Sequence, residues 1–221
     1  MGPSCTSEDF YPGLLEQVAL TYEQRFKRYG DTPRGVFWKN ADWQRHRYNI
    51  LVRIFDREEF DDGLKIHDFG CGYGAFFDYL TAHSAMHASY YTGTEMCKEI
   101  LAAAQKRVDD PRANFISGIF PTVHADYTFV SGTFNMRLDA EDTVWSEYIR
   151  VSLLQLWQHT RRGFAFNLLN DSTHEKHKGL YYASPKFFIE FVRTNMDPSA
   201  ELIIEPPLPD FTILARRSQP L

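Results

Sequence analysis

The stretch Lys65–Leu80, KIHDFGCGYGAFFDYL, decides the fold of this 221-residue chain. It reads as a short buried strand that Asp68 closes, a turn in which Gly70, Gly72 and Gly74 alternate, and the start of a helix. Glycine tolerates positive φ and lets a ligand approach the backbone closely. The helix that follows offers free N–H groups and the positive end of a dipole. The stretch therefore predicts a strand–turn–helix unit that holds a cofactor.

The spacing of this turn distinguishes between cofactors. The dinucleotide fingerprint G-x-G-x-x-G would place its third glycine where Ala75 stands, whereas the run here is D-x-G-x-G-x-G. A carboxylate at Asp68 would repel a pyrophosphate but could receive an ammonium group, directly or through water. S-adenosylmethionine carries such a group on its amino-acid tail. The alternative is a glycine-rich turn of some other α/β protein.

The run IHDFGCGYG resembles the first motif of the class I S-adenosylmethionine-dependent methyltransferases. A second predicted strand, Ser89 to Glu95, ends in an acid 21 residues beyond Gly74. One carboxylate can bind both hydroxyls of a ribose, and Glu95 matches the ribose-binding acid of this family. Met96 is then placed to pack on the adenine. A surface glutamate at a strand end is the alternative reading of Glu95.

The resemblance covers about residues 60–217 and implies the fold. We expect an α/β, doubly wound Rossmann-like sheet that is mostly parallel, with one antiparallel edge strand from the C-terminal part of the chain. Periodicity alone gives only alternating helices and strands. Two predicted helices, within 14–30 and 43–55, precede the first strand and form a plausible lid. The predicted division is a helical segment over 1–59 and a cofactor-binding domain over 60–221.

The predicted cofactor site departs from the family pattern at one position. An Asp that commonly binds the adenine amino group is replaced by Ile119, which leaves adenine to backbone groups and apolar packing. Trp38, Gln44 and Arg47 resemble a W…Q..R pattern of one methyltransferase group, in which Arg47 would bind the cofactor carboxylate or the substrate, unless it is a solvated surface residue. The predicted cofactor-binding residues are Asp68, Gly70, Cys71, Gly72, Gly74, Glu95, Met96, Gly118, Ile119, Phe120, Ser131 and Arg47.

The predicted catalytic residues lie late in the chain. Methyl transfer from a sulfonium is an in-line displacement, so the protein chiefly supplies positioning. A base is required only if the acceptor arrives protonated, and a histidine suits that task near neutral pH. The candidates are His174 and His177 on the polar loop 171–182, Tyr181 and Tyr182 as binding residues, and Asn135 after the fourth strand. Each histidine could instead be a solvated loop residue.

Composition limits the partners. The formal charge is −5 and the sequence pI is near 5.9, which favours no nucleic-acid partner. Three cysteines, Cys5, Cys71 and Cys97, show no metal-ligand spacing, so no metal is expected. No signal peptide and no 18-residue apolar run are found. We expect a cytoplasmic protein without a membrane partner, as a monomer or homodimer.

The function predicted from these residues is S-adenosyl-L-methionine-dependent methyl transfer to an oxygen or nitrogen of a small molecule. Three alternatives remain at this point. The acceptor could be RNA or protein, although the acidic balance disfavours it. The chain could be a cofactor-binding domain without catalysis. It could also be a dehydrogenase, because Glu95 suits a nicotinamide ribose as well.

Overall fold

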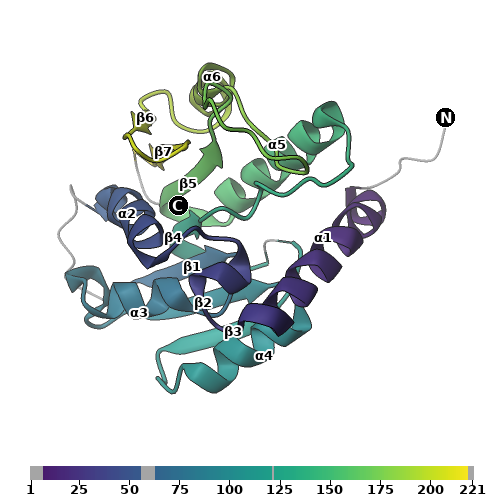
Figure 1. Ribbon diagram of the computed structural model, residues 1–221. Helices are drawn as coiled ribbons and strands as arrows, with labels where there is room; N and C mark the ends of the chain where they lie inside the picture. The colour runs from purple at the N-terminus through teal and green to yellow at the C-terminus, as the bar shows by residue number, and fades with distance from the viewer. Residues whose placement is uncertain (1–6, 56–62, 121, 219–221) are drawn as a thin grey trace.

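A computed structural model describes residues 7–55, 63–120 and 122–218, with side chains from residue 13 onward. In this part of the chain seven strands form one sheet in the order β3-β2-β1-β4-β5-β7-β6 (Figure 1). The strands are β1 (Lys65–Phe69), β2 (Tyr90–Glu95), β3 (Ala113–Ser117), β4 (Ala125–Val130), β5 (Thr160–Leu169), β6 (Glu201–Ile204) and β7 (Asp210–Arg216). The first five are parallel, and β7 runs antiparallel to β5 and β6. The predicted doubly wound fold is confirmed, with β7 one place inside the edge.

The central strands are apolar on both sides because helices cover both faces of the sheet. In β5, Phe164, Phe166 and Leu168 belong to one hydrophobic cluster, and the intervening Ala165 belongs to the other. Side chains along a strand alternate between the two faces. A strand that is buried on both faces therefore reads as a continuous apolar run, which is why the sequence predicts β5 well.

The helices form one layer on each face of the sheet. One layer holds α2 (Ala41–Leu51), α3 (Ala75–Thr81) and α4 (Lys98–Arg107), with the short 3-10 turns η2 (Val52–Phe55) and η3 (Ser84–Met86). The other holds α5 (Asp142–Gln158) and α6 (Pro185–Asn195). Asn40 caps α2 by accepting from the backbone N–H of Trp43, and Ser184 caps α6 with Pro185 at its first position.

Helix α1 (Ser7–Tyr29) bridges the two layers (Figure 1). Toward its C-terminus Lys27 pairs with Glu99 of α4 at 3.0 Å, and toward its N-terminus Leu15 and Val18 pack in the cluster that contains residues of α5. The 3-10 turn η1 (Pro33–Val36) then leads to α2. The predicted boundary between residues 59 and 60, and Cys5, lie outside the described residues.

The turn after β4 is the main difference from the predicted elements. We expected a strand over 126–135, but β4 ends at Val130. Gly132 has φ +73, a left-handed conformation that stops an extended strand, and the backbone N–H of Asn135 donates to the carbonyl of Gly132. Residues 131–135 are therefore a compact turn at the carboxyl end of β4. Within the described residues, no helix combines the length and apolar character that crossing a membrane requires.

Candidate active site

A cavity lies at the carboxyl ends of β1, β2 and β4, where ligands bind in open α/β sheets. Its volume is about 920 Å³ when the open space at its mouth is included. The floor comes from the Asp68–Tyr73 turn, from Thr94–Met96 and from Ser131–Thr133. Leu15, Val18 and Tyr22 of α1, Trp38, and Gln44 of α2 cover it. The N-terminal helices therefore close a narrow space over the sheet edge.

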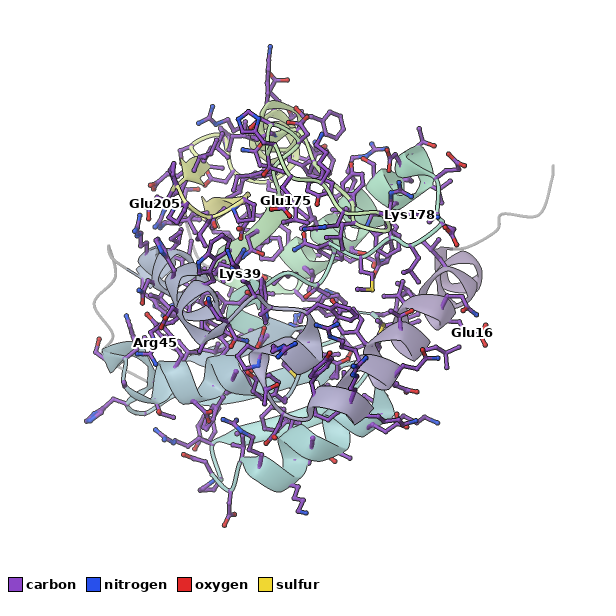
Figure 2. The ribbon with its side chains drawn as sticks, viewed as in Figure 1. Glu16, Lys39, Arg45, Glu175, Lys178 and Glu205 are labelled. Carbon is purple, nitrogen blue, oxygen red and sulfur yellow. The ribbon has the colours of Figure 1, made fainter. Side chains whose placement is uncertain are left out.

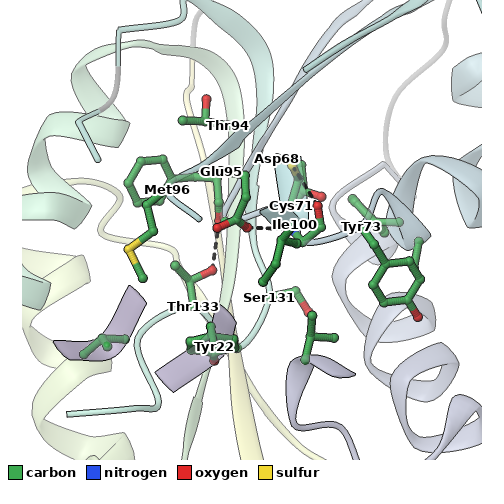
Figure 3. Close-up of a pocket in the computed structure, with 18 of the residues that line it drawn as sticks. Tyr22, Asp68, Cys71, Tyr73, Thr94, Glu95, Met96, Ile100, Ser131 and Thr133 are labelled. Atoms are coloured by element: carbon green, nitrogen blue, oxygen red, sulfur yellow. Dashed lines mark hydrogen bonds between the residues drawn. The ribbon is translucent and has the colours of Figure 1, made fainter. Parts of the chain in front are cut away.

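Asp68 lines this cavity (Figure 3) and carries an oxygen without a hydrogen-bond partner. Its Oδ2 accepts the hydroxyl of Tyr91 at 2.6 Å, whereas Oδ1 is buried without a hydrogen-bond partner. Burial raises the pKa of Asp68 to about 7, Tyr91 lowers it, and Glu95 raises it further. A buried carboxylate oxygen without a donor is costly. An ammonium group would satisfy it, so Asp68 fits the amino group of S-adenosylmethionine.

We expect the affinity for S-adenosylhomocysteine to fall as the pH falls through about 7. Only the ionised carboxylate attracts an ammonium, and the pKa of Asp68 in the ligand-free protein is about 7. Below that pH the ligand must displace a proton, which weakens binding by up to about tenfold per pH unit. Calorimetric titrations at about pH 8 and about pH 6 measure this loss. 5′-Methylthioadenosine lacks the amino-acid tail, so its affinity should stay nearly constant, and an equal loss for both ligands would contradict the assignment.

The glycine turn leaves no space for a side chain at its first glycine. Gly70 has φ +80, and a Cβ there would lie 2.3 Å from Thr133 Oγ1 and 2.6 Å from Thr133 Cγ2. Gly72 has φ +57 but has ordinary room, with Val36 Cγ1 at 3.7 Å. Both glycines and Cys71 line the cavity, and burial raises the pKa of the Cys71 thiol well above its usual value. A buried neutral thiol suits packing rather than nucleophilic attack.

Glu95 ties the end of β2 to the glycine turn. Its Oε2 accepts the backbone N–H of Gly72 and its Oε1 that of Cys97, both at 2.9 Å. Burial raises the pKa of Glu95, and the bonds from Cys97 and Gly72 lower it. Each carboxylate oxygen can accept a second donor, and the side chain lines the cavity. The carboxylate is therefore fixed in position with capacity left for the two hydroxyls of a ribose.

We expect Glu95→Gln to weaken binding of S-adenosylhomocysteine and 5′-methylthioadenosine alike, by about 1.5–3 kcal/mol, because both ligands carry the ribose. Calorimetry measures the two affinities. Glu99→Gln is the matched control, since Glu99 is an exposed carboxylate on α4 that pairs with Lys27 outside the cavity. If Glu95→Gln lowers only the thermal stability and leaves both affinities intact, Glu95 is a structural strand-end acid.

The predicted adenine residues are only partly at the cavity. Met96, Gly118 and Ile119 line it, together with Ile100 of α4. Phe120 does not line it and instead packs against the hydrophobic cluster of the α5 face. Gly74 also lies off the cavity: it precedes α3 with φ +83, and a Cβ there would lie 3.1 Å from Phe115 Cζ. Gly74 thus permits helix–sheet packing, not ligand approach.

The turn after β4 supplies a second unpartnered polar atom. Ser131 lines the cavity, and its Oγ is buried without a hydrogen-bond partner. Thr133 lines it too, but its Oγ1 donates to the carbonyl of Phe69 at 2.9 Å. Ser131 is therefore the side chain of this turn whose hydroxyl has no hydrogen-bond partner within the protein, and its role as a cofactor-binding residue stays a prediction.

Arg47 does not offer its charge to the cavity. It is buried, its Nε and Nη2 donate to Asp210 Oδ2 and Oδ1 at 2.5 and 2.7 Å, and its Nη1 donates to the carbonyl of Trp43 at 3.0 Å. It is absent from the cavity lining. The prediction that Arg47 binds the cofactor carboxylate or the substrate directly is corrected: the guanidinium is held by Asp210, the first residue of β7.

The predicted catalytic residues are not brought to the cavity. His174 and His177 are exposed on their loop, and the imidazole of His177 lies 3.6 Å from the carboxylate of the exposed Glu175. Figure 2 labels Glu175 and Lys178 of this loop. Asn135 Oδ1 accepts the backbone N–H of Leu169, and the carbonyl of Asn135 accepts the N–H of Tyr181. Tyr182 Oη accepts the N–H of His177. These residues order the turn and the loop, and none of the predicted catalytic residues lines the cavity.

Several lining residues escaped the sequence analysis. Tyr22 of α1 and Tyr73 of the glycine turn line the cavity, as do Trp145 and Tyr148 of α5. Aromatic residues at helical spacing read as core, and Trp145 is indeed almost fully buried, with its Nε1 donating to the carbonyl of Phe134. Burial raises the pKa of Tyr22, and Glu95 raises it further. No pattern in the sequence separates a core aromatic from one that lines a cavity at the core's edge. Among the described residues, no cluster of His, Cys, Asp and Glu could hold a metal ion.

Comparison with known proteins gives sequence and fold relatives. No family model matches the chain. It is 36% identical over 160 residues to the Mycobacterium tuberculosis (strain ATCC 25618 / H37Rv) protein named "Putative methyltransferase Rv1506c", covering 71% of this chain and 95% of that protein.

Two solved structures resemble the fold. Magnesium protoporphyrin IX methyltransferase from Synechocystis PCC 6803 with bound S-adenosylhomocysteine has a TM-score of 0.66 at 11% identity, over 96% of this chain and 100% of that one. Human N-acetylserotonin methyltransferase in complex with S-adenosylmethionine has a TM-score of 0.59 at 13% identity, over 92% of this chain and 59% of that one. At such identities the likeness establishes the shared fold.

Proposed function

Because the chain belongs to the class I S-adenosylmethionine-dependent methyltransferases, we propose that it methylates an oxygen or nitrogen atom of a small molecule bound in the cavity under α1. The observation that carries this proposal is the cover that α1 and α2 place over the cavity. Leu15, Val18 and Tyr22 cover it from above, and Trp38 and Gln44 flank it. A loop of RNA or protein would need an open groove, and the formal charge of −5 gives no support for a polyanionic acceptor.

Different lining residues would bind different parts of the cofactor. Asp68 would hold the ammonium group, Glu95 the ribose, and Met96, Ile100 and Ile119 the adenine. Bound S-adenosylmethionine would supply a methyl group attached to a sulfonium. A lone pair of the acceptor would form the new bond to the methyl carbon, and the electrons of the broken carbon–sulfur bond would remain on sulfur. The N-terminal helices exclude water, and the turn 131–133 bounds the reacting region. Catalysis then rests on positioning.

The cavity supports catalysis without a histidine base. Among the described lining residues none is a lysine, arginine or histidine. An amine acceptor attacks with its own lone pair, and a hydroxyl acceptor must lose its proton to a group other than a lysine, arginine or histidine side chain of the lining. The acceptor's nucleophile therefore has to be usable near neutral pH without a resident cationic or imidazole group.

We expect the double variant His174→Asn, His177→Asn to keep its turnover within about twofold of the unaltered protein. A general base would contribute about 10²–10⁴-fold, and both side chains are exposed away from the cavity lining. Conversion of labelled S-adenosylmethionine to S-adenosylhomocysteine in the presence of a cell's small-molecule extract measures the rate. A loss of a hundredfold or more would restore the base hypothesis.

A labelled-methyl experiment tests the acceptor class. The protein is incubated with methyl-labelled S-adenosylmethionine and with three fractions of a cell extract: small molecules, RNA and protein. The proposal predicts label in the small-molecule fraction that depends on the protein and is reduced by Asp68→Asn. Label that enters only RNA or only protein would contradict it.

A further inference from the structure

Trp38 packs directly on the turn after β4. A Cβ built on Gly132 would lie 2.5 Å from Trp38 Cη2 and 2.7 Å from Cζ2, so the indole occupies the space beside the glycine. Gly132 is itself fixed, since its backbone N–H donates to Asn167 Oδ1 at 2.8 Å. Both Trp38 and Gly132 line the cavity. The indole is therefore the wall of the cavity at the end of β4.

This end of the cavity is the one that faces an acceptor. The strands run in the order β2-β1-β4, and the two acids proposed for the cofactor are Glu95 on β2 and Asp68 on β1. A ligand whose ribose is at Glu95 and whose ammonium is at Asp68 covers β2 and β1. Beyond the two acids the lining includes the β4 turn, with Trp38 beside its Gly132, and Trp145 and Tyr148 of α5. That region is left for the molecule that receives the methyl group.

A buried ion pair holds the indole in place. The guanidinium carbon of Arg47 lies 4.5 Å from the centre of the Trp38 ring, a cation–π distance. The same guanidinium forms a bidentate pair with Asp210, and both side chains are about 95% buried. Asp210 reaches this edge because β7 is antiparallel, so its first residue pairs with Leu169 near the carboxyl end of β5. Arg47 therefore joins the sheet to one face of Trp38.

The charges around this wall restrict the acceptor. The positive charge of Arg47 is matched by Asp210, and the carboxylates Asp68 and Glu95 belong to the proposed cofactor site. Leu15, Val18 and Trp145 provide only apolar surface or a committed N–H group. The other polar side chains of the lining, such as Ser131 and Gln44, are neutral, so a charged acceptor would lose its hydration here without gaining a counter-ion, which is costly.

We propose that Trp38 bounds the acceptor part of the cavity, that Arg47 and Asp210 are the positioning residues that hold it there, and that the acceptor is an uncharged aromatic molecule. The inference rests on the proposed function, because it names the acceptor class of the same cavity. A flat uncharged ring matches an indole wall with further aromatic surface from Trp145 and Tyr148.

Fluorine NMR of protein labelled with 5-fluorotryptophan tests the positioning role. The chain has four tryptophans, and the Trp38 signal is the one that disappears in Trp38→Phe. In Arg47→Ala and in the milder Asp210→Asn we expect this signal to shift or broaden, while the signal of the distant Trp157 stays in place. Lys39→Ala is the matched control, because it removes a cation 4.1 Å from the ring centre of Trp43 and should move that signal only.

The same variants separate positioning from cofactor binding. S-adenosylhomocysteine affinity should stay within about threefold in Asp210→Asn and in Arg47→Ala, because neither residue lines the cavity. An unchanged Trp38 signal in both variants would overturn the positioning role. A loss of affinity for S-adenosylhomocysteine, but not for 5′-methylthioadenosine, would instead return Arg47 to the cofactor carboxylate.

Phenol, aniline and benzoate are the probes for the acceptor class. In protein saturated with S-adenosylhomocysteine, phenol and aniline should shift the Trp38 signal at millimolar concentration, and benzoate should not. No response to phenol and aniline, or an equal response to benzoate, would overturn the acceptor class. Because no turnover is measured, this failure is distinct from that of the proposed function, which fails when label enters only RNA or protein.

Discussion

Replacing Asp68 with asparagine is expected to weaken S-adenosylhomocysteine binding by about 3 kcal/mol or more, at least about 100-fold in Kd. Asparagine keeps the shape and can still accept the hydroxyl of Tyr91, which reaches Asp68 Oδ2 at 2.6 Å. It cannot supply the negative charge that an ammonium group needs at the buried, unpartnered Oδ1. Calorimetric titration measures the loss.

Two controls make this result specific to the ammonium contact. 5′-Methylthioadenosine lacks the amino-acid tail and should bind the Asp68→Asn variant nearly as well as the unaltered protein. Asp78→Asn, at an exposed position on α3 that pairs with Arg107, should change neither affinity. Burial raises the pKa of Asp68 from 3.8 to about 7, so this group makes the folded state less stable as the pH rises between those two values. At about pH 8 the ligand-free Asp68→Asn variant should therefore unfold no more easily than the unaltered protein. Equal losses for both ligands would show that Asp68 supports the turn instead.

Gly70→Ala is expected to lower the affinity for S-adenosylhomocysteine by at least about 30-fold, about 2 kcal/mol. The backbone has φ +80 there, and the added Cβ would lie 2.3 Å from Thr133 Oγ1 and 2.9 Å from Thr133 Cβ. Thr133 cannot move without breaking its hydrogen bond to the carbonyl of Phe69. The substitution therefore forces apart the glycine turn and the β4 turn, which together form the cavity floor. Calorimetry measures the affinity, and thermal unfolding checks that the variant is folded.

Matched glycines separate backbone strain from the loss of space. Gly30→Ala has a similar φ of +65, no atom within 4 Å and a place outside the cavity, so it should leave the affinity unchanged. Gly72 has φ +57 and ordinary room around it. The affinity of Gly72→Ala should therefore lie between the affinities of Gly70→Ala and Gly30→Ala. If Gly70→Ala binds as tightly as Gly30→Ala, the turn does not need the close approach that the structure shows.

The local part of the site could be predicted from the sequence because its residues are close in the chain. Asp68 and the glycines sit in one strand–turn unit, and Glu95 follows one helix and one strand later. The backbone fixes their relation, since β1 pairs with β2 in parallel and Glu95 accepts the N–H of Gly72. Once the parallel sheet is predicted, these side chains must meet at its carboxyl edge.

The partner of Arg47 could not be predicted from the sequence. Its partner, Asp210, is 163 residues away and reaches it only because β7 runs antiparallel beside β5. A local pattern shows a cation before the cofactor strand but not which anion will neutralise it. Of the three residues that resemble a known pattern, Trp38 and Gln44 line the cavity and Arg47 does not.

The position of the loop histidines could not be predicted for a related reason. A polar loop that leaves β5 at the ligand-binding edge can fold over the cavity or away from it, and its sequence permits both. Here isolated bridges pair Met136 with Leu180 and Asn170 with Ala183. These contacts hold the loop against the β4 turn and leave its tip, with His174 and His177, exposed. Tertiary pairing therefore decides which side chains line the cavity.

A structure of the protein with S-adenosylhomocysteine bound tests the site assignment most directly. We expect the ligand's ammonium on Asp68 Oδ1, its ribose hydroxyls on Glu95, and its sulfur facing the turn 131–133 beside Trp38, with the Arg47–Asp210 pair intact. A ligand whose carboxylate displaces Asp210 from Arg47, or whose ammonium lies away from Asp68, would contradict it.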